Sequence, residues 1–167
     1  MKELAGMATK GTYVYEWPRP MVTADAAVFA SFGGKIKLLL VQRRYLPYQG
    51  HWALPGGFIE MDEDLKDAAA RELAEETGLQ GVRLEQLGTF GRPGRDPRGR
   101  VITVVYTGIA EKGFENLEAA DDAAAVEWFD VENLPQMAFD HDEIARCAIE
   151  NVKRTAPFQD AARRRKG

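Results

Sequence analysis

Three glutamates follow a pair of glycines at a spacing that could bind a metal ion. Glu72, Glu75 and Glu76 lie shortly after Gly56 and Gly57. On a helix with 3.6 residues per turn, the three carboxylates share one arc with the apolar side chains that precede them. Carboxylates held this close repel one another, and a divalent cation would remove that repulsion. Because the ligands are all oxygens, Mg²⁺ is the expected ion and Mn²⁺ the alternative. A charge run by itself would instead indicate a solvated acidic face.

The segment that carries the glutamates has the composition of a helix. Residues 64–77 are rich in Ala, Leu, Glu, Lys and Arg, which predicts a helix from Asp64 to Thr77. Gly78 follows, where a left-handed cap costs glycine least. The two glycines before the helix would let backbone approach a metal or phosphate closely.

The stretch from Gly57 to Leu79 resembles the Nudix box, and every fixed position is filled. These positions are Gly57, Glu63, Arg71-Glu72-Leu73, Glu75-Glu76 and Gly78-Leu79. The resemblance implies hydrolysis of a nucleoside diphosphate linked to another group, with attack on the diphosphate bridge. It also implies an α/β fold, the Nudix α/β/α sandwich with a mixed sheet.

The resemblance assigns roles to individual residues of the box. It implies that the metal is held by Glu72, Glu75, Glu76 and the backbone carbonyl of Gly56. Glu63 and Arg71 are expected to support the loop and helix as an ion pair. A helical pair between Arg71 and Glu75, four residues apart, is the alternative contact.

An arginine-rich loop is the candidate for substrate binding. It runs from Gly91 to Gly99 and contains Arg92, Arg95 and Arg98, with Asp96 placed to orient an arginine. Planar guanidinium groups suit phosphate, so the predicted substrate ligands are Arg95, Asp96 and Arg98, with Arg44 at the end of an earlier strand. A mobile surface loop is the alternative.

The same loop resembles the ADP-ribose branch of the family, which carries a proline about fifteen residues beyond the box. Pro93 lies fourteen residues after Leu79. The implied reaction converts ADP-ribose to AMP and ribose 5-phosphate. Two alternatives stay open, which are cleansing of oxidised nucleoside triphosphates and a non-catalytic ADP-ribose-binding module.

The general base is sought outside the box as well as within it. Asp122 lies six residues before Trp128, a spacing similar to that of the nucleoside-triphosphate-cleansing branch. A solvated acidic turn is the alternative, and Glu75 or Glu76 could serve as the base instead.

Four aromatic residues could stack on adenine or lie in the core or its rim: Tyr45, Tyr48, Trp52 and Phe58.

Composition limits the compartment and the partners. The chain has 167 residues, one cysteine and a net charge of −4. The basic tail at 157–167 holds four positive charges at 163–166, and without these four the chain has a net charge of about −8, which argues against nucleic-acid binding. No apolar run approaches membrane-spanning length, so no membrane partner and a cytoplasmic location are expected.

Cys147 is expected as a small core residue, and His141 at a helix cap or on the surface. The resemblance is compatible with a homodimer.

The remaining pattern predicts one domain at 20–156 after an extended lead-in at 1–19. Alternating or apolar runs predict strands at 22–31, 35–44, 52–54, 82–90, 100–110 and 125–129, and a second helix at 142–155. Strands before and after each helix favour a mixed sheet covered by helices.

Overall fold

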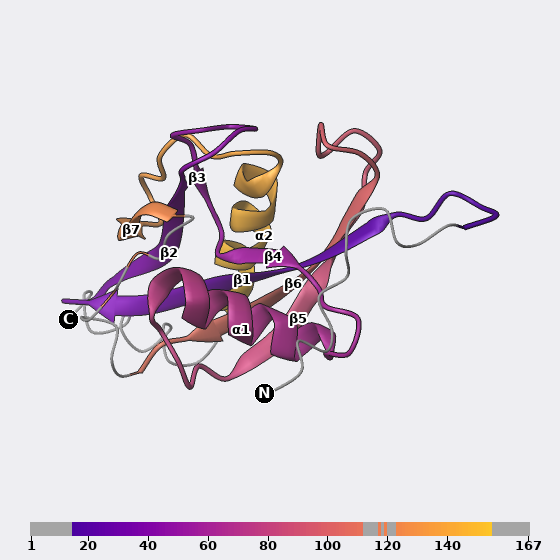
Figure 1. Cartoon of the computed structure of the whole chain (residues 1–167). Coiled ribbons are helices and arrows are strands. Elements are labelled where there is room, and N and C mark those ends of the chain that lie inside the picture. Colours follow the sequence, from indigo (N-terminus) through magenta and orange to yellow (C-terminus); the bar gives the residue numbers. More distant parts are fainter. Residues whose placement is uncertain (1–14, 112–116, 118, 120–122, 155–167) are drawn as a thin grey trace, which may run out of the picture.

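The computed structural model describes residues 15–111, 117, 119 and 123–154. This part of the chain forms a sheet flanked by two helices (Figure 1). The strands are β1 (Met21–Phe32), β2 (Lys35–Arg43), β3 (Trp52–Ala53), β4 (Gly56–Phe58), β5 (Leu84–Phe90), β6 (Val101–Ile109) and β7 (Ala123–Asp130), and the helices are α1 (Leu65–Thr77) and α2 (His141–Lys153).

The sheet is mixed, as the sequence predicts. Its main strand order is β3-β2-β1-β6-β5, with β1 parallel to β6 and the other pairs antiparallel. β6 pairs with β1 from Met21 to Phe29, so the opposite edge of β1 must serve both other partners. That edge pairs with β2 over 29–32 and with β4 over 23–25. The strand that pairs with this edge of β1 therefore changes from β4 to β2 halfway along β1, and β2 also pairs with β7.

The period of two along β1 builds two separate cores. Ala24, Ala26 and Val28 pack in the cluster that contains α1, whereas Ala27 and Phe29 pack in the cluster that contains α2. Side chains of a strand alternate between faces, so one strand can serve both layers. The sandwich of helix, sheet and helix is confirmed.

Helix α1 begins and ends close to the predicted positions. Asp64 is its N-cap, where the side chain accepts a hydrogen bond from the backbone N–H of Lys66 at 3.1 Å. Gly78 has φ 73° and donates its N–H to the carbonyl of Ala74, which is the left-handed cap expected there. The cap stops the helix directly after its glutamates.

Two expectations are corrected by the structure. Cys147 is exposed rather than part of the core, because the buried stripe of α2 runs through Ile144, Ala145, Ala148 and Ile149. The Gly56–Phe58 segment, which lies outside the strands predicted from the sequence, forms strand β4 against β1. No helix in the described part of the chain has the length and apolar character needed to cross a bilayer.

Candidate active site

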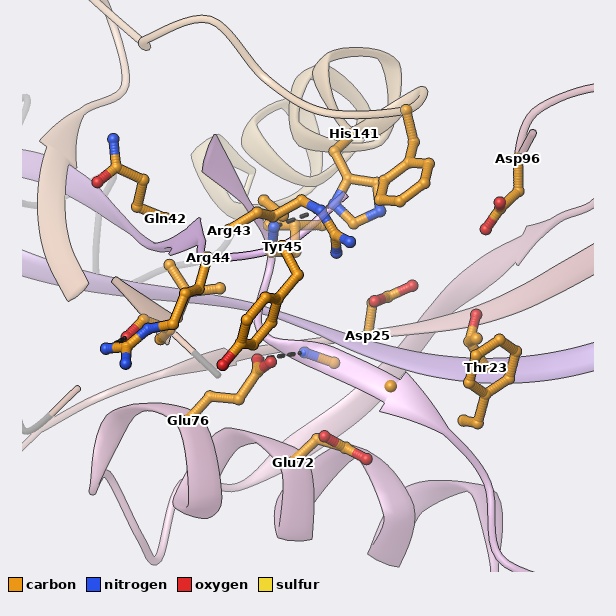
Figure 2. Close-up of a pocket in the computed structure, with 18 of the residues that line it drawn as sticks. Thr23, Asp25, Gln42, Arg43, Arg44, Tyr45, Glu72, Glu76, Asp96 and His141 are labelled. Atoms are coloured by element: carbon orange, nitrogen blue, oxygen red, sulfur yellow. Dashed lines mark hydrogen bonds between the residues drawn. The ribbon is translucent and has the colours of Figure 1, made fainter. Parts of the chain in front are cut away.

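A cavity of about 310 Å³ opens where β1 exchanges β2 for β4 (Figure 2). Its walls come from β1, β2, β4, α1, the 91–99 loop and the start of α2. Four carboxylates and four arginines are among the lining residues, which are Asp25, Glu72, Glu76, Asp96, Arg43, Arg44, Arg95 and Arg98. The cavity thus joins the two regions that the sequence marks for metal and for substrate.

Two box glutamates converge on β4 at one end of the cavity. The backbone N–H of Gly56 donates to Glu76 Oε2 at 2.9 Å. A Cβ placed on Gly57 would lie 2.5 Å from Glu72 Oε1, so only glycine leaves room for that carboxylate. Figure 2 shows both carboxylates reaching from α1 toward this strand.

Glu75 does not line the cavity with this pair. Its side chain is 59% exposed, and its carboxylate accepts from Arg71 Nη1 at 3.1 Å instead of lining the cavity. A step of one residue turns a helix by about 100°, so Glu75 and Glu76 point in different directions. Arg71 Nη1 donates to Glu72 Oε1 as well as to Glu75 Oε2, so it links these two carboxylates although Glu75 does not line the cavity.

Arg71 connects the box loop to the helix. Its Nε and Nη2 donate to the carboxylate of Glu63 at 3.0 and 2.8 Å, and its Nη1 also reaches Glu72 at 2.7 Å. The hydrogen bond from Arg71 lowers the pKa of Glu63, and the same contact raises the pKa of Arg71. Both contacts considered from the sequence, with Glu63 and with Glu75, are therefore present.

The donor set suits a hard divalent cation in kind. Glu72 and Glu76 bring carboxylate oxygens to a cavity that Gly56 also lines, and the carbonyl of Gly56 would be the third oxygen ligand. No preformed cluster of three acidic, histidine or cysteine side chains occurs among the described residues. Mg²⁺ is commonly held by one or two carboxylates, with the other positions left to water and substrate phosphates. Two carboxylates and a carbonyl fit that mode of binding.

The loop arginines are engaged by neighbouring carboxylates. Arg95 donates from Nε and Nη2 to Asp140 at 2.8 and 2.6 Å, and both side chains are buried. Arg98 binds Asp96 in the same two-pronged manner, with an Nη2–Oδ2 distance of 2.7 Å. Burial raises the pKa of Asp96, but the hydrogen bonds from Arg98 outweigh it and lower that pKa overall. Arg95 ties the loop to α2, whereas Arg98 remains partly exposed at the cavity.

Arginine and aromatic side chains contact one another in the lining of the cavity. The guanidinium of Arg98 lies 5.0 Å from the ring centre of Phe58 and 5.3 Å from that of Phe139, and Arg43 lies 4.9 Å from Phe139. Arg44 also lines the cavity and donates to the carbonyl of Ala123 at 2.8 Å. Such cation–π contacts orient guanidinium groups.

The four candidate adenine-stacking residues separate into two groups. Tyr45 and Phe58 line the cavity. Trp52 packs edge-on against Phe129 in the α2 core, with ring centres 4.6 Å apart, and Tyr48 packs on Phe139. Asp122, the predicted base, lies outside the described residues.

Two residues of the cavity were missed by sequence reasoning. Asp25 is buried in β1, where its carboxylate accepts a hydrogen bond from the hydroxyl of Thr103. A charged residue inside an apolar strand is a signal that could have identified it. His141, expected at a cap or on the surface, is instead buried in the cavity wall. His141 reaches the cavity because the start of α2 packs beside it, and the helical period of the sequence does not predict that packing.

Comparison with known proteins identifies the fold family. Residues 19–151 match the NUDIX domain. The chain belongs to the Nudix family. A Nudix relative from Methanocaldococcus jannaschii, named ADP-ribose pyrophosphatase, is 46% identical over 110 residues, which cover 66% of this chain and 64% of that protein. The "ADPR responsive transcriptional repressor NtrR" of Acinetobacter baylyi is 35% identical over 139 residues, covering 80% of this chain and 55% of that protein.

A solved Nudix structure agrees with the fold. The NUDIX domain of Shewanella oneidensis NrtR, crystallised with ADP ribose, has a TM-score of 0.76 and 34% identity over 81% of this chain and 90% of that one. This Nudix chain spans less than two thirds of the length of the two curated relatives above. Activities of those whole proteins are therefore considered below only as proposals.

Proposed function

We propose that this protein is a metal-dependent Nudix pyrophosphohydrolase that converts ADP-ribose to AMP and ribose 5-phosphate. The observation that carries the proposal is the arrangement of one cavity. Glu72 and Glu76 converge on β4, and arginines and aromatic rings line the same cavity. A diphosphate needs cations on its oxygens and a site for attack on phosphorus, and this cavity offers groups for both.

The proposed reaction adds water across one P–O bond of the bridge. Glu72, Glu76 and the carbonyl of Gly56 would hold Mg²⁺, or Mn²⁺ in its place, which when bound supplies positive charge to the diphosphate and acidifies the attacking water. Arg98 and Arg44 are proposed to orient the phosphates. The proton of the water passes to a carboxylate, for which Glu76 and Asp122 are the candidates together with Glu75.

The chain's own ion pairs support a positioning role for part of the loop. Arg95 already donates two hydrogen bonds to Asp140, so its fork is occupied within the protein. We infer that Arg95 and Asp96 act mainly by fixing the loop, and that Arg98, which is partly exposed, provides the contact to substrate. The similarity to a named ADP-ribose pyrophosphatase at 46% identity favours the same substrate.

A substrate panel tests the proposal. ADP-ribose, NADH, sugar nucleotides, dinucleoside polyphosphates and oxidised dGTP are incubated with Mg²⁺, with Mn²⁺ or with EDTA, and products are separated by chromatography. AMP and ribose 5-phosphate should form fastest from ADP-ribose and only with metal. Faster release of pyrophosphate from oxidised dGTP would replace the proposal with nucleotide cleansing.

A binding module is the second candidate function. It is favoured by the similarity to the Acinetobacter repressor and to the Shewanella domain bound to ADP ribose. Titration calorimetry with ADP-ribose, run beside the turnover assay, separates the two. Binding without products in the presence of Mg²⁺ or Mn²⁺ would support the module and refute the enzyme. The homodimer, the cytoplasmic location and the absence of nucleic-acid binding stay predictions.

A further inference from the structure

His141 presents a hydrogen-bond donor of fixed orientation to the cavity. The backbone N–H of Leu54 donates to its Nδ1 at 3.0 Å. Because Nδ1 accepts a hydrogen bond, the proton of the neutral ring must sit on Nε2. Burial lowers the pKa of His141, which keeps the ring neutral, although nearby Asp25 opposes this effect. The side chain is thus a locked donor in a residue that is only 5% exposed.

The Nε2–H group is open to the cavity. No hydrogen bond to Nε2 occurs within the described part of the chain, where Nδ1 takes the only one made by this ring. That part of the chain also has no fully buried side-chain nitrogen or oxygen without a partner. Nε2 must therefore reach space that a ligand or water can enter, and the surrounding cavity provides it.

The neighbouring groups favour a hydroxyl over a phosphate at this position. Asp25 and Asp96 line the same cavity, and Figure 2 shows Asp25 on the side of His141 that faces α1, with Asp96 farther from Glu76. Phosphoryl oxygens only accept hydrogen bonds and would be repelled by these carboxylates. A hydroxyl can accept from a neutral N–H and donate to a carboxylate at the same time.

We propose that His141 binds the substrate by donating its Nε2–H to a hydroxyl of the sugar attached to the nucleoside diphosphate. The assignment rests on the proposed function, because it takes ADP-ribose as the substrate. It makes His141 a specificity residue for a hydroxylated leaving group, and Figure 2 shows it across the cavity from Glu72 and Glu76.

The backbone before His141 supports a functional placement. Phe139 has φ 56°, a left-handed conformation that is rare for an aromatic residue. Backbone strain of this kind persists where the surrounding structure requires it, and it gathers at binding sites. Here it places Phe139 against the guanidinium groups of Arg43 and Arg98, and it brings His141 two residues later into the cavity wall.

Two substitutions separate the hydrogen bond to Leu54 from the hydrogen bond to substrate. In His141→Asn the amide oxygen can still accept from Leu54, but no donor reaches the position of Nε2. In His141→Gln a donor can reach that position, while the acceptor for Leu54 is lost. His51→Asn, at the other histidine of the chain, is the matched control because His51 lies outside the cavity wall.

The kinetic and binding readouts give a clear expectation. His141→Asn should keep the melting temperature of the wild type but raise KM for ADP-ribose about tenfold, with a smaller change in kcat, since one hydrogen bond is lost. His141→Gln should recover part of that loss, and His51→Asn should match the wild type. Calorimetry in EDTA should show the same order of affinities without turnover.

A substrate analogue identifies the group that His141 binds. The analogue is ADP-ribose with the hydroxyl groups of its terminal sugar removed. The wild type should bind it about tenfold more weakly than ADP-ribose, whereas His141→Asn should discriminate far less, because the interaction is already lost. If His141→Asn lowers the affinity for ADP-ribose and for the analogue by the same factor relative to the wild type, His141 contacts a phosphate, and the assignment is overturned.

Failure of this inference can be told from failure of the proposed function. If the wild type binds and hydrolyses ADP-ribose but His141→Asn does so equally well, only the role of His141 is refuted. If the wild type neither binds nor hydrolyses ADP-ribose, both proposals are refuted.

Discussion

The buried ion pair between Arg95 and Asp140 gives a sharp stability prediction. The two side chains are 3% and 8% exposed and are joined by two hydrogen bonds of 2.6 and 2.8 Å. Asp140 is the N-cap of α2, yet its side chain makes no capping hydrogen bond there. Asp140→Ala therefore removes the ion pair without removing a cap.

The expected loss is large because Arg95 would keep its charge in a buried site. Breaking one partner of a buried pair costs about 3–5 kcal/mol in the free energy of unfolding. For a domain of this size, 1 kcal/mol corresponds to roughly 2–4 °C in melting temperature, so a drop on the order of 10 °C is expected. Asp142→Ala removes the exposed pair with Arg146 on the same helix, and it should cost at most about 1 kcal/mol.

Urea unfolding followed by circular dichroism, together with thermal melts, measures these differences. The double variant Arg95→Met/Asp140→Ala removes the stranded charge as well and should be more stable than Asp140→Ala alone. The reasoning is refuted if Asp140→Ala lies within 1 kcal/mol (roughly the spread of ordinary surface substitutions) of Asp142→Ala. It is also refuted if the double variant is less stable than the single one.

Three other predictions concern the cavity. Glu76→Gln and Glu75→Gln should each lower kcat at least about 100-fold with Mg²⁺, with the larger loss at Glu76, whereas the exposed Glu85→Gln should be neutral. Rates near the wild type for both variants would remove the metal-ligand role of Glu76 and the candidacy of both glutamates as the base. Gly57→Ala should displace Glu72 and lower activity at least about tenfold with little change in melting temperature. The control is Gly88→Ala, which should retain activity because its Cβ would lie 3.9 Å from the nearest neighbouring atom. The pKa of His141 is lowered from 6.5 by burial, so below that pH the unfolded chain binds more protons than the folded one, and the free energy of unfolding should fall as the pH drops below 6.5 and stay level above it. Urea titrations at several pH values measure the slope of the free energy of unfolding against pH, which should be smaller in His141→Asn than in the wild type. Equal slopes would contradict the buried neutral ring.

Sequence pattern was sufficient where the structure depends on local spacing. The period of α1 placed Glu72 and Glu76 next to the buried Ala68 and Ala69, and Gly78 ended the helix where expected. The apolar run at 35–44 predicted a strand, and on the observed β2 both Leu38 and Leu39 are fully buried, in different cores. Local rules failed at Gly56–Phe58, because a strand there exists only through pairing with β1.

The sequence by itself determined the family, the glycine and glutamate end of the cavity, and the arginines of the 91–99 loop. Only the tertiary structure decided which charges remain available to a substrate. Arg95 meets Asp140 across 45 residues of chain, and Leu54 meets His141 across 87. Contacts at such separations arise from packing of the whole sandwich, so no local period encodes them. Because of these contacts Arg95 fixes the 91–99 loop, and His141 presents a hydrogen-bond donor to the cavity.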